Sequence, residues 1–587
     1  MRRAEAASAA TAAGEALEAA AERRRCRRLL QHLMLWTFLG CWLLAYGGVR
    51  SPDSEVVFRT AEALAARGTF ALESDLPGWP GFGVAAGRDG RLYSIFGPAE
   101  SVALAPLVAA ASRVQRSAWY GDGFMPPAPS HYTGAGLRAF LTGVAPPAEE
   151  RHAHALRFLL AWFNPAIAAL TAGVLFLLLV RLSGSATAAA AVSVLYAFGT
   201  LALPYAGTFF SEPLATLAAL GSLSLLVQPQ AGDPWAAAGP AAGRAGGQTS
   251  AAAPPPPAPA AVAYGPGWRR LLGAGAVLGL GCAAHLSAAL FAPFHLAYCA
   301  LAAGRAGGRW RAGGRAALAF GGGLLLVLVL LGGHNWARFG SIWETGRTVP
   351  GLTIQYGRFV APWRNVSGLL WSGGRGLLWY SPAVVCGALS WPCMRRRQAL
   401  LADALAGMCL FRLVFIAARS DWSGGFCLGP RYLVMLLPFV LIPCAYPLAA
   451  GLRRRPGRWL ASSGLVTAAC VAEQLYLSTG EVFSFQHWIR LTSIQRQIDV
   501  FGTERIYRAW EYSPLLHLLA GRRGPWPLQR VPAGNWTVWI ALAAAASLLI
   551  GLIWCRWLAW ERRHAPRRGA AGPCAGGGSS LSTGEER

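Results

Sequence analysis

Residues 23–55 read RRRCRRLLQHLMLWTFLGCWLLAYGGVRSPDSE, which is a basic run, a long apolar run and a short acidic one. The apolar part, Leu29 to Gly48, holds about 20 positions, and as an α-helix these cross ~30 Å of hydrocarbon. Because arginines that flank a span stay in the cytoplasm, the pattern predicts that Asp53 and Glu55 emerge on the other side. This span is longer than a usual signal-peptide core, so we expect it to be retained.

The composition of the whole chain indicates a polytopic membrane protein. Of its 587 residues, 54% are hydrophobic and 14% are charged, whereas soluble domains carry about 25% charged residues. The net charge of +26 comes from arginine, and basic chains often bind nucleic acid through phosphate contacts. Many of these arginines, however, lie in short runs between apolar segments, as at 395–397, 453–455 and 562–563. Such runs are topology signals that also attract anionic lipid, so we expect membrane lipids as partners and no nucleic acid.

Apolar windows along the chain predict an all-α fold with about twelve transmembrane helices. Alternating the sides of these helices puts the basic loops in the cytoplasm, which supports the count. Residues 99–114 are also apolar, but a span there would move every later loop to the opposite side of the membrane. We therefore expect an interfacial or re-entrant helix at these residues. The predicted spans are 29–48, 157–182, 186–206, 212–227, 270–286, 287–303, 316–332, 376–393, 399–418, 431–449, 458–477 and 535–556.

Two transmembrane modules joined by a linker follow from this pattern. Residues 231–263 consist mainly of proline, alanine and glycine, which cannot form a core and predict a disordered cytoplasmic linker. Three long segments fall on the non-cytoplasmic side, where functional residues commonly occupy loops held by a scaffold. The expected organisation is a cytoplasmic segment 1–28, an N-terminal module 29–228 with outer loop 49–156, a linker 229–268, a C-terminal module 269–557 with outer loops 333–375 and 478–534, and a cytoplasmic tail 558–587.

Asp53 and Glu55 follow the first span directly and have two interpretations. At positions i and i+2 they would diverge on a helix, so they reach one site together only if this stretch is extended. Pro52 biases Ser51 toward an extended conformation. The apolar spacing from Glu55 onward predicts an amphipathic interfacial helix that ends at Gly68. Asp53 is then either a cap for that helix or a chemical group.

Six further stretches carry a family resemblance. The chain resembles the GT-C superfamily of integral-membrane glycosyltransferases, in its phospholipid-carrier-dependent branch, and is similar to protein O-mannosyltransferases and lipid A aminoarabinose transferases. The resemblance runs from the first span to the tenth in a consistent order. Its stretches are SPDSEVVFRTAEALAARGTFAL (51–72), GRDGRLYSIFGPAESVALAP (87–106), GTFFSEPLATL (207–217), NWARFGSIWETG (335–346), GGRGLLWYSP (373–382) and DWSGGFCLGPRYL (421–433).

The resemblance implies transfer of a hexosyl or pentosyl group, with inversion, from a polyprenyl-phosphate carrier. The acceptor would be a protein, a glycan or a lipid on the non-cytoplasmic side. An acidic residue just after the first span is the proposed catalytic base in such enzymes, which makes Asp53 the leading candidate and Glu55 the second. The adjacent Asp-Glu pair of the mannosyltransferases appears in this chain as Asp-Ser-Glu. Which of the two carboxylates corresponds to the base therefore stays open.

A lipid phosphate that leaves with negative charge needs cations nearby. Arg91 and Tyr93 lie in the GRLYS match, where the aminoarabinose transferases place a phosphate-contacting basic residue. Arg431 enters the tenth predicted span and is a second candidate. For each single arginine, interfacial anchoring is an equal alternative. The outer arginines are Arg59, Arg91, Arg347, Arg358, Arg364, Arg375 and Arg431.

Four more polar residues stand at or inside predicted spans. Glu212 opens the fourth span, where it either complements the helix macrodipole or contacts a sugar or a cation. His334 begins the second outer segment and is a candidate for lining a sugar site. Arg412 and His285 lie deeper in their spans, and for Arg412 we expect a structural charge with partners.

The sequence demands no cofactor, although a divalent metal is compatible with it. Neither a nucleotide-binding motif nor a zinc motif such as HExxH occurs. The rival function is a polytopic transporter or lipid scramblase, which predicts inverted repeats and charges at mid-membrane. The expected location is the plasma membrane in a bacterium or the endoplasmic reticulum in a eukaryote, with the active site on the non-cytoplasmic face.

Overall fold

The computed structural model describes most of the chain and confirms the helical fold. Its described residues are 2–45, 48–49, 51–76, 81–115, 156–228, 267–307, 310–348, 358–425, 427–478, 489, 493–499 and 502–519. Within them almost every regular element is a helix, and one small sheet is the exception. The last predicted span (535–556), the tail and nearly all of the linker lie outside the described residues.

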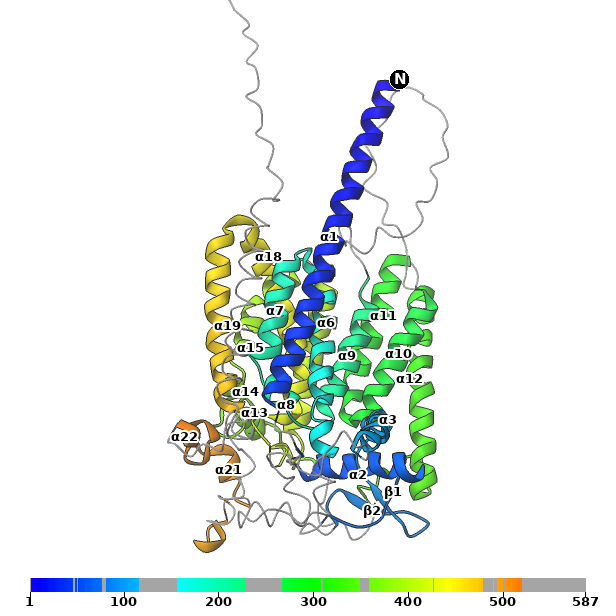
Figure 1. Ribbon diagram of the computed structural model, residues 1–587, viewed down its shortest axis with the longest axis vertical. Helices are drawn as coiled ribbons and strands as arrows, with labels where there is room; N and C mark the ends of the chain where they lie inside the picture. The colour runs from blue at the N-terminus through cyan, green and yellow to red at the C-terminus, as the bar shows by residue number, and fades with distance from the viewer. Residues whose placement is uncertain are drawn as a thin grey trace, which may run out of the picture. The chain divides into compact units, whose positions relative to one another are not determined.

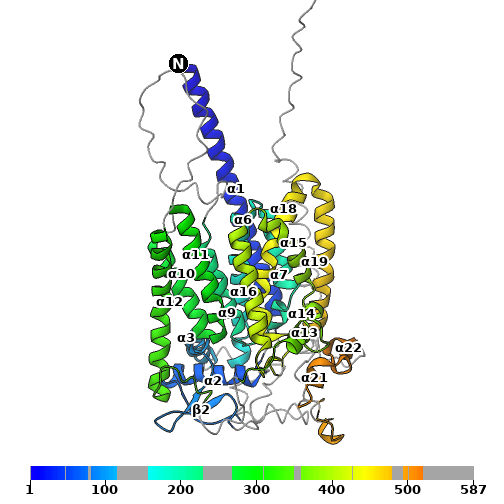
Figure 2. The ribbon, with the colours of Figure 1, turned by 180° about the vertical axis from the view of Figure 1, so that it is seen from behind.

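The long helices stand side by side with similar directions (Figure 1 and, from behind, Figure 2). The helical elements of this bundle, including the short turns that connect or continue the long helices, are in chain order α1 (Arg2–Leu43), α6 (Phe163–Ser183), α7 (Ala186–Phe198), α8 (Ala202–Ala206), α9 (Glu212–Leu226), α10 (Trp268–Ala284), η2 (Leu286–Phe291), α11 (Ala292–Gly307), α12 (Trp310–Phe339), α15 (Ala383–Arg395), α16 (Ala399–Ala417), η3 (Arg431–Leu436), α17 (Leu437–Leu441), η4 (Ile442–Cys444), α18 (Ala445–Arg454) and α19 (Pro456–Ser478).

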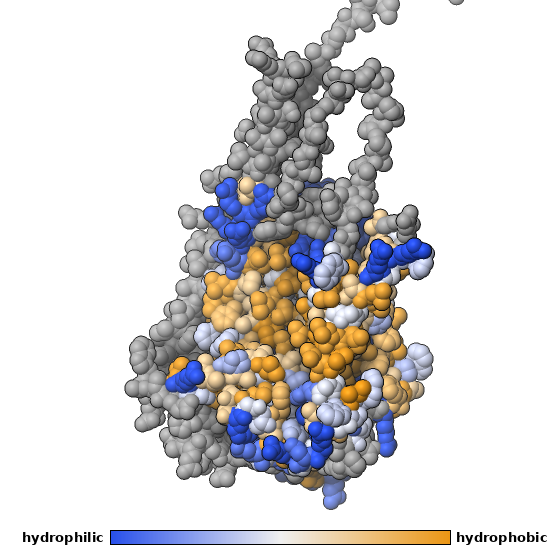
Figure 3. Space-filling model, turned by 90° about the vertical axis from the view of Figure 1, so that its right-hand side faces the viewer, coloured by the Kyte–Doolittle hydropathy of each residue, from blue (hydrophilic) through white to orange (hydrophobic). Residues whose placement is uncertain are grey.

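Six helical segments in the described part of the chain are long and apolar enough to cross a membrane. They are Leu156–Ser183, Leu286–Ala306, Trp310–Phe339, Ala399–Ala417, Arg431–Arg454 and Pro456–Ser478. The polytopic architecture is therefore supported, and the count of twelve spans stays a prediction. Figure 3 shows the matching surface, an apolar band with hydrophilic residues above and below it. Exposed Leu326, Val329 and Leu330 of α12 are typical of a side in contact with lipid.

Glycines let α10 and α12 approach closely. A Cβ atom built on Gly275 would lie 1.9 Å from the carbonyl oxygen of Phe320, and one on Gly323 would lie 1.9 Å from that of Leu272. Side chains at these positions would thus collide with the neighbouring backbone. Small residues at a helix interface are the usual way in which membrane helices pack tightly.

The shorter elements gather at the end of the helices opposite the N-terminus (Figures 1 and 2). Here α2 (Pro52–Arg67) lies crosswise, and α3 (Pro98–Gln115) packs against α2 and α10. The strands β1 (Ala71–Leu72), β2 (Val84–Ala86) and β3 (Leu92–Ser94) form an antiparallel sheet in the order β1-β3-β2, with Tyr93 paired to both Ala71 and Ala85. The same end holds α13 (Trp363–Trp371), α14 (Leu377–Tyr380), α21 (Arg505–Arg508), η5 (Trp510–Tyr512) and α22 (Pro514–Leu519).

The helix after the first apolar segment starts earlier than its apolar spacing indicates. Ser51 is extended, with φ −121° and ψ 138°, and Pro52 begins α2, as the fixed φ of proline favours at a first turn. Asp53 and Glu55 both lie in that turn, so the extended conformation that would join them is absent. Gly68 ends the helix with φ 65°, and its N–H donates to the carbonyl of Leu64 at 3.0 Å. The predicted end of the helix is confirmed.

Candidate functional site

Arg431 joins two carboxylates that come from distant parts of the chain. Its Nη1 donates to Oδ2 of Asp53 at 2.5 Å, and its Nε donates to Oε1 of Glu212 at 2.5 Å. Glu212 is completely buried and Arg431 is 7% exposed, whereas the side chain of Asp53 keeps 18% of its surface. Three residues that the sequence nominated separately thus form one cluster, which we call the Arg431 cluster.

Local structure explains how each member reaches this cluster. Asp53 stands in the first turn of α2, and Glu212 is the first residue of α9, followed by proline. Both carboxylates therefore complement a helix macrodipole while they bind Arg431. Arg431 begins η3 directly after Pro430, and its guanidinium lies 3.8 Å from the centre of the Phe210 ring. Such a cation–π contact helps to hold a partly desolvated cation in place.

Further basic side chains lie near the Arg431 cluster. His285 places Nε2 3.7 Å from Oε1 of Glu212, and the charges of Arg347, Arg412, Arg419 and Arg431 all act on this histidine. The region is therefore rich in guanidinium groups, which recognise phosphate well.

Two of these surrounding arginines have clear partners. Arg412 donates to the carbonyls of Ser287 and Tyr432 at 2.7 and 3.0 Å. It is the partnered buried charge that its place in the span predicted. Arg419 pairs with Asp421 at 2.5 Å.

Glu100 of α3 is a member of this region that sequence reasoning missed. It is completely buried, and neither carboxyl oxygen has a hydrogen-bond partner. Burial, followed by the charge of Glu212, raises the pKa of Glu100 well above its usual value, against the opposing charge of Arg431. Burial therefore disfavours the charged form of this carboxyl beside the ion pairs. The available signal was a lone acid in the apolar stretch 99–114.

Glu55 belongs to a different group of charges. It is completely buried, accepts two hydrogen bonds from Arg157 at 2.9 and 2.6 Å, and accepts one from Arg59 at 3.0 Å. Burial alone would raise the pKa of Glu55, but Arg157 and then Arg59 outweigh it and lower that pKa. Arg59 is thereby engaged with Glu55 and with the carbonyl of Asp75. Sequence reasoning did not single out Arg157, which lies at the start of the second predicted span.

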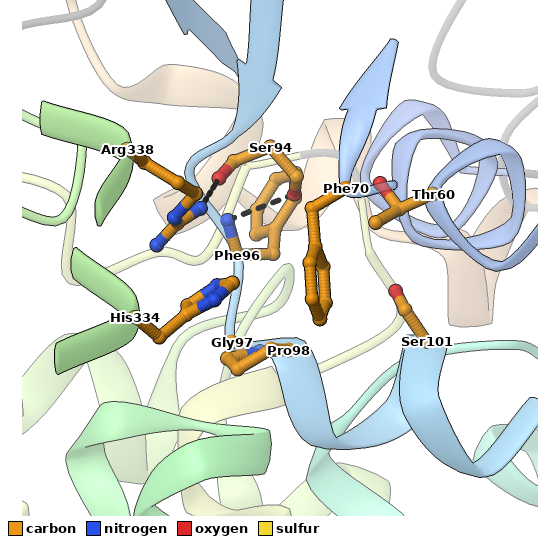
Figure 4. A pocket seen from close by; sticks show the side chains of 9 residues that line it. All are labelled: Thr60, Phe70, Ser94, Phe96, Gly97, Pro98, Ser101, His334 and Arg338. Atoms are coloured by element: carbon orange, nitrogen blue, oxygen red, sulfur yellow. Dashed lines mark hydrogen bonds between the residues drawn. The ribbon is translucent and has the colours of Figure 1, made fainter. Parts of the chain in front are cut away.

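The remaining nominated residues lie apart from the Arg431 cluster. Arg91 is exposed and close to Asp89 at 3.8 Å, and the hydroxyl of Tyr93 donates to Asp89 at 2.7 Å. His334 contacts the ring of Phe70 and lines a separate pocket (Figure 4). No hydrogen bond or ion pair within the described ranges links Arg91, Tyr93 or His334 to the cluster.

The other outer arginines have mixed surroundings. Arg375 is buried and donates to the carbonyls of Gly374, Ser423 and Gly425. Arg358 and Arg364 are exposed. Among the residues that the structure describes, no group of three or more His, Cys, Asp or Glu side chains is placed to hold a metal ion.

Comparison with known proteins assigns no family to this chain. No protein-family model matches the chain, and no curated protein matches it. The resemblance to GT-C enzymes therefore rests on the six stretches quoted above.

Proposed function

We propose that the chain is a GT-C-type glycosyltransferase that moves a sugar from a polyprenyl-phosphate carrier to an acceptor on the non-cytoplasmic side of a membrane. The observation that carries this proposal is the Arg431 cluster. In it one guanidinium forms ion pairs with the candidate base, Asp53, and with the fully buried Glu212. A transferase of this kind needs a cation for the leaving phosphate next to a carboxylate for the incoming hydroxyl. Both groups are present within one set of hydrogen bonds.

The proposed reaction is a direct displacement. The acceptor oxygen forms a bond to the anomeric carbon and passes its proton to the carboxylate of Asp53. The bond between that carbon and the phosphate oxygen breaks, and its electron pair stays on the polyprenyl phosphate. Arg431 stabilises the charge that grows there. A phosphate that engages Arg431 also loosens the Asp53 ion pair, which frees the carboxylate to act as a base.

Within this proposal Glu212 acts as a positioning residue. It is fully buried and holds Nε of Arg431, so it fixes the guanidinium while Nη1 exchanges Asp53 for phosphate. Between the two carboxylates nominated as base, the contacts favour Asp53. Glu55 is sequestered by Arg157 and Arg59, whereas Asp53 is partly exposed.

The decisive experiment measures transfer of labelled sugar from synthetic polyprenyl-phosphate hexoses and pentoses by purified protein in proteoliposomes. We expect Asp53→Asn to lower turnover at least about 100-fold, since general base catalysis contributes roughly 10²–10⁴. Asp403→Asn is the matched control, because Asp403 is half-exposed and pairs only with Arg395 among the described residues. The control should retain wild-type turnover.

Two results would contradict the proposal in different ways. Equal turnover in wild type and Asp53→Asn would exclude Asp53 as the base. Failure of every donor, together with lipid or solute flux through the same proteoliposomes, would instead support the rival function of a transporter or scramblase.

A further inference from the structure

His285 is a neighbour of the Arg431 cluster to which the displacement reaction assigns no role. It stands between α10 and η2, where its extended backbone, with φ −145° and ψ 112°, ends one helix before the other begins. Its N–H donates to the carbonyl of Gly281 at 2.9 Å, and its carbonyl accepts from the N–H of Ala288 at 2.8 Å. The backbone at this break is therefore fully hydrogen-bonded, which holds the imidazole ring in a defined place.

A chain of hydrogen bonds also orients the ring. Buried Arg412 donates from Nη2 to Oγ of Ser287 at 3.0 Å and from Nη1 to the carbonyl of the same serine at 2.7 Å. Oγ of Ser287 lies 2.7 Å from Nδ1 of His285. A guanidinium only donates, whereas a hydroxyl accepts and also has one hydrogen to give. Since the described contacts offer that hydrogen no other acceptor, Ser287 accepts from Arg412 and donates to Nδ1 of His285.

This arrangement places the ring proton on Nε2, because a neutral imidazole that accepts at one nitrogen donates from the other. Nε2 lies 3.7 Å from Oε1 of Glu212, which is longer than a hydrogen bond. The same oxygen already accepts from Nε of Arg431. Within the described ranges the Nε2–H group of His285 thus has no hydrogen-bond acceptor, although it lies beside the ion pairs of the cluster.

The Nε2 atom of His285 is also accessible, in contrast to that of two other histidines. Nε2 of His295 and of His334 is fully buried without a partner, whereas Nε2 of His285 is not. The side chain of His285 keeps 17% of its surface and that of Asp53 keeps 18%. Asp53 binds one end of the Arg431 guanidinium, and His285 lies beside the carboxylate that binds the other end. Two accessible groups thus flank one cation.

We propose that Nε2–H of His285 donates a hydrogen bond to the phosphate of the prenyl carrier while Arg431 binds the same phosphate. This inference rests on the proposed function, since it assigns a further phosphate contact to the same site. A neutral donor stabilises the negative charge of the phosphate without forming an ion pair with Asp53 or Glu212. The proton stays on Nε2 throughout, and the departing oxygen keeps its electron pair.

The test measures binding of farnesyl phosphate, a short prenyl phosphate, to detergent-purified protein, with farnesol as the phosphate-free probe. The amide nitrogen of glutamine reaches about as far as Nε2, and that of asparagine only as far as Nδ1. We expect His285→Asn to weaken binding about 10- to 100-fold, the size of one hydrogen bond to a charged group. His285→Gln should stay within about 3-fold of wild type, and farnesol should not distinguish the variants.

Two controls separate this role from a structural one. His32→Asn should bind as wild type does, because His32 is an exposed residue of α1. If His285 served only as the partner of Ser287, asparagine would be the better replacement and the order of the two variants would reverse. If it served only Glu212, the thermal unfolding midpoint of His285→Asn would fall below that of His285→Gln, whereas we expect equal midpoints.

Each outcome decides the proposal. Weak binding by His285→Asn together with retained binding by His285→Gln supports it. Equal binding in all variants, an equal loss in both, the reverse order or no binding by wild type overturns it. Sugar transfer by wild type alongside one of these contrary results leaves the transferase function standing and removes only the role of His285. Failure of every sugar donor alongside the supporting pattern removes the transferase function and keeps the phosphate contact.

Discussion

Asp53 and Glu55 are two positions apart but have different partners because they lie on a helix. Successive side chains rotate by about 100° along an α-helix, so i and i+2 face away from each other. One carboxylate therefore meets Arg431 and the other meets Arg157. The inserted serine that left the assignment of the base open in the sequence is a buried residue between them.

At this scale the first prediction concerns Glu55. We expect Glu55→Gln to destabilise the protein by about 3 kcal/mol at neutral pH, because it removes the fully buried carboxylate that compensates Arg157, whose other carboxylate partner, Glu62, is partly exposed. The pKa of Glu55 is lowered on folding, so its stabilising contribution is present above its ordinary value of 4.5 and is lost as the pH falls through the lowered pKa. The difference between wild type and Glu55→Gln should therefore shrink in acid.

Unfolding midpoints in detergent between pH 7.5 and 3 measure both effects. Glu73→Gln is the control, since the side chain of Glu73 is 75% exposed and such exposed pairs contribute about 0–1 kcal/mol. A Glu55→Gln variant as stable as this control would contradict a structural role for Glu55.

Among the elements, the pair α10 and α12 shows how glycine spacing sets a helix contact. We predict that Gly275→Ala destabilises the protein by about 1–3 kcal/mol, which is the usual cost of overpacking a close contact. Its added methyl would meet the carbonyl of Phe320. Gly273→Ala, on the same helix, has open space around the added carbon and should be neutral or stabilising by up to about 1 kcal/mol.

Thermal unfolding of both glycine variants in one detergent provides the measurement. If Gly273→Ala proved as harmful as Gly275→Ala, a general cost of alanine in α10 would replace the packing explanation.

Across the whole molecule, the α2–α3 segment, α13, α14 and the short helices near residue 510 share one end (Figures 1 and 2). We predict that this end is non-cytoplasmic. The variant Glu73→Cys should react with a membrane-impermeant maleimide in intact cells, because Glu73 follows α2 and its side chain is exposed. A cysteine at Gly457→Cys, in the first turn of α19, should react only after permeabilisation.

Wild type serves as the background for this labelling, since the cysteines in the described residues are buried or half-buried. A reversed pattern would put the Arg431 cluster in the cytoplasm and remove the topological basis of the proposed function.

Features that depend on neighbouring residues could be predicted from the sequence alone. Apolar length indicated membrane helices, Gly68 marked the end of α2, and Glu212 marked the start of α9, because hydropathy and capping act over a few residues. The same local reasoning explains the error at the start of α2. Spacing of apolar residues cannot locate a first turn whose side chains are acidic.

The partners of charged residues were decided only by the tertiary structure. Arg431 meets Asp53 and Glu212 across 378 and 219 positions, and Glu55 meets Arg157 across 102. Tertiary packing likewise buries both carboxyl oxygens of Glu100 and Nε of Arg338 without a hydrogen-bond partner. An ion pair depends on distance in space and on the loss of water around it, and neither quantity is encoded by local spacing. The sequence by itself thus determined a helical membrane protein with candidate carboxylates, and packing decided which of them meet a cation.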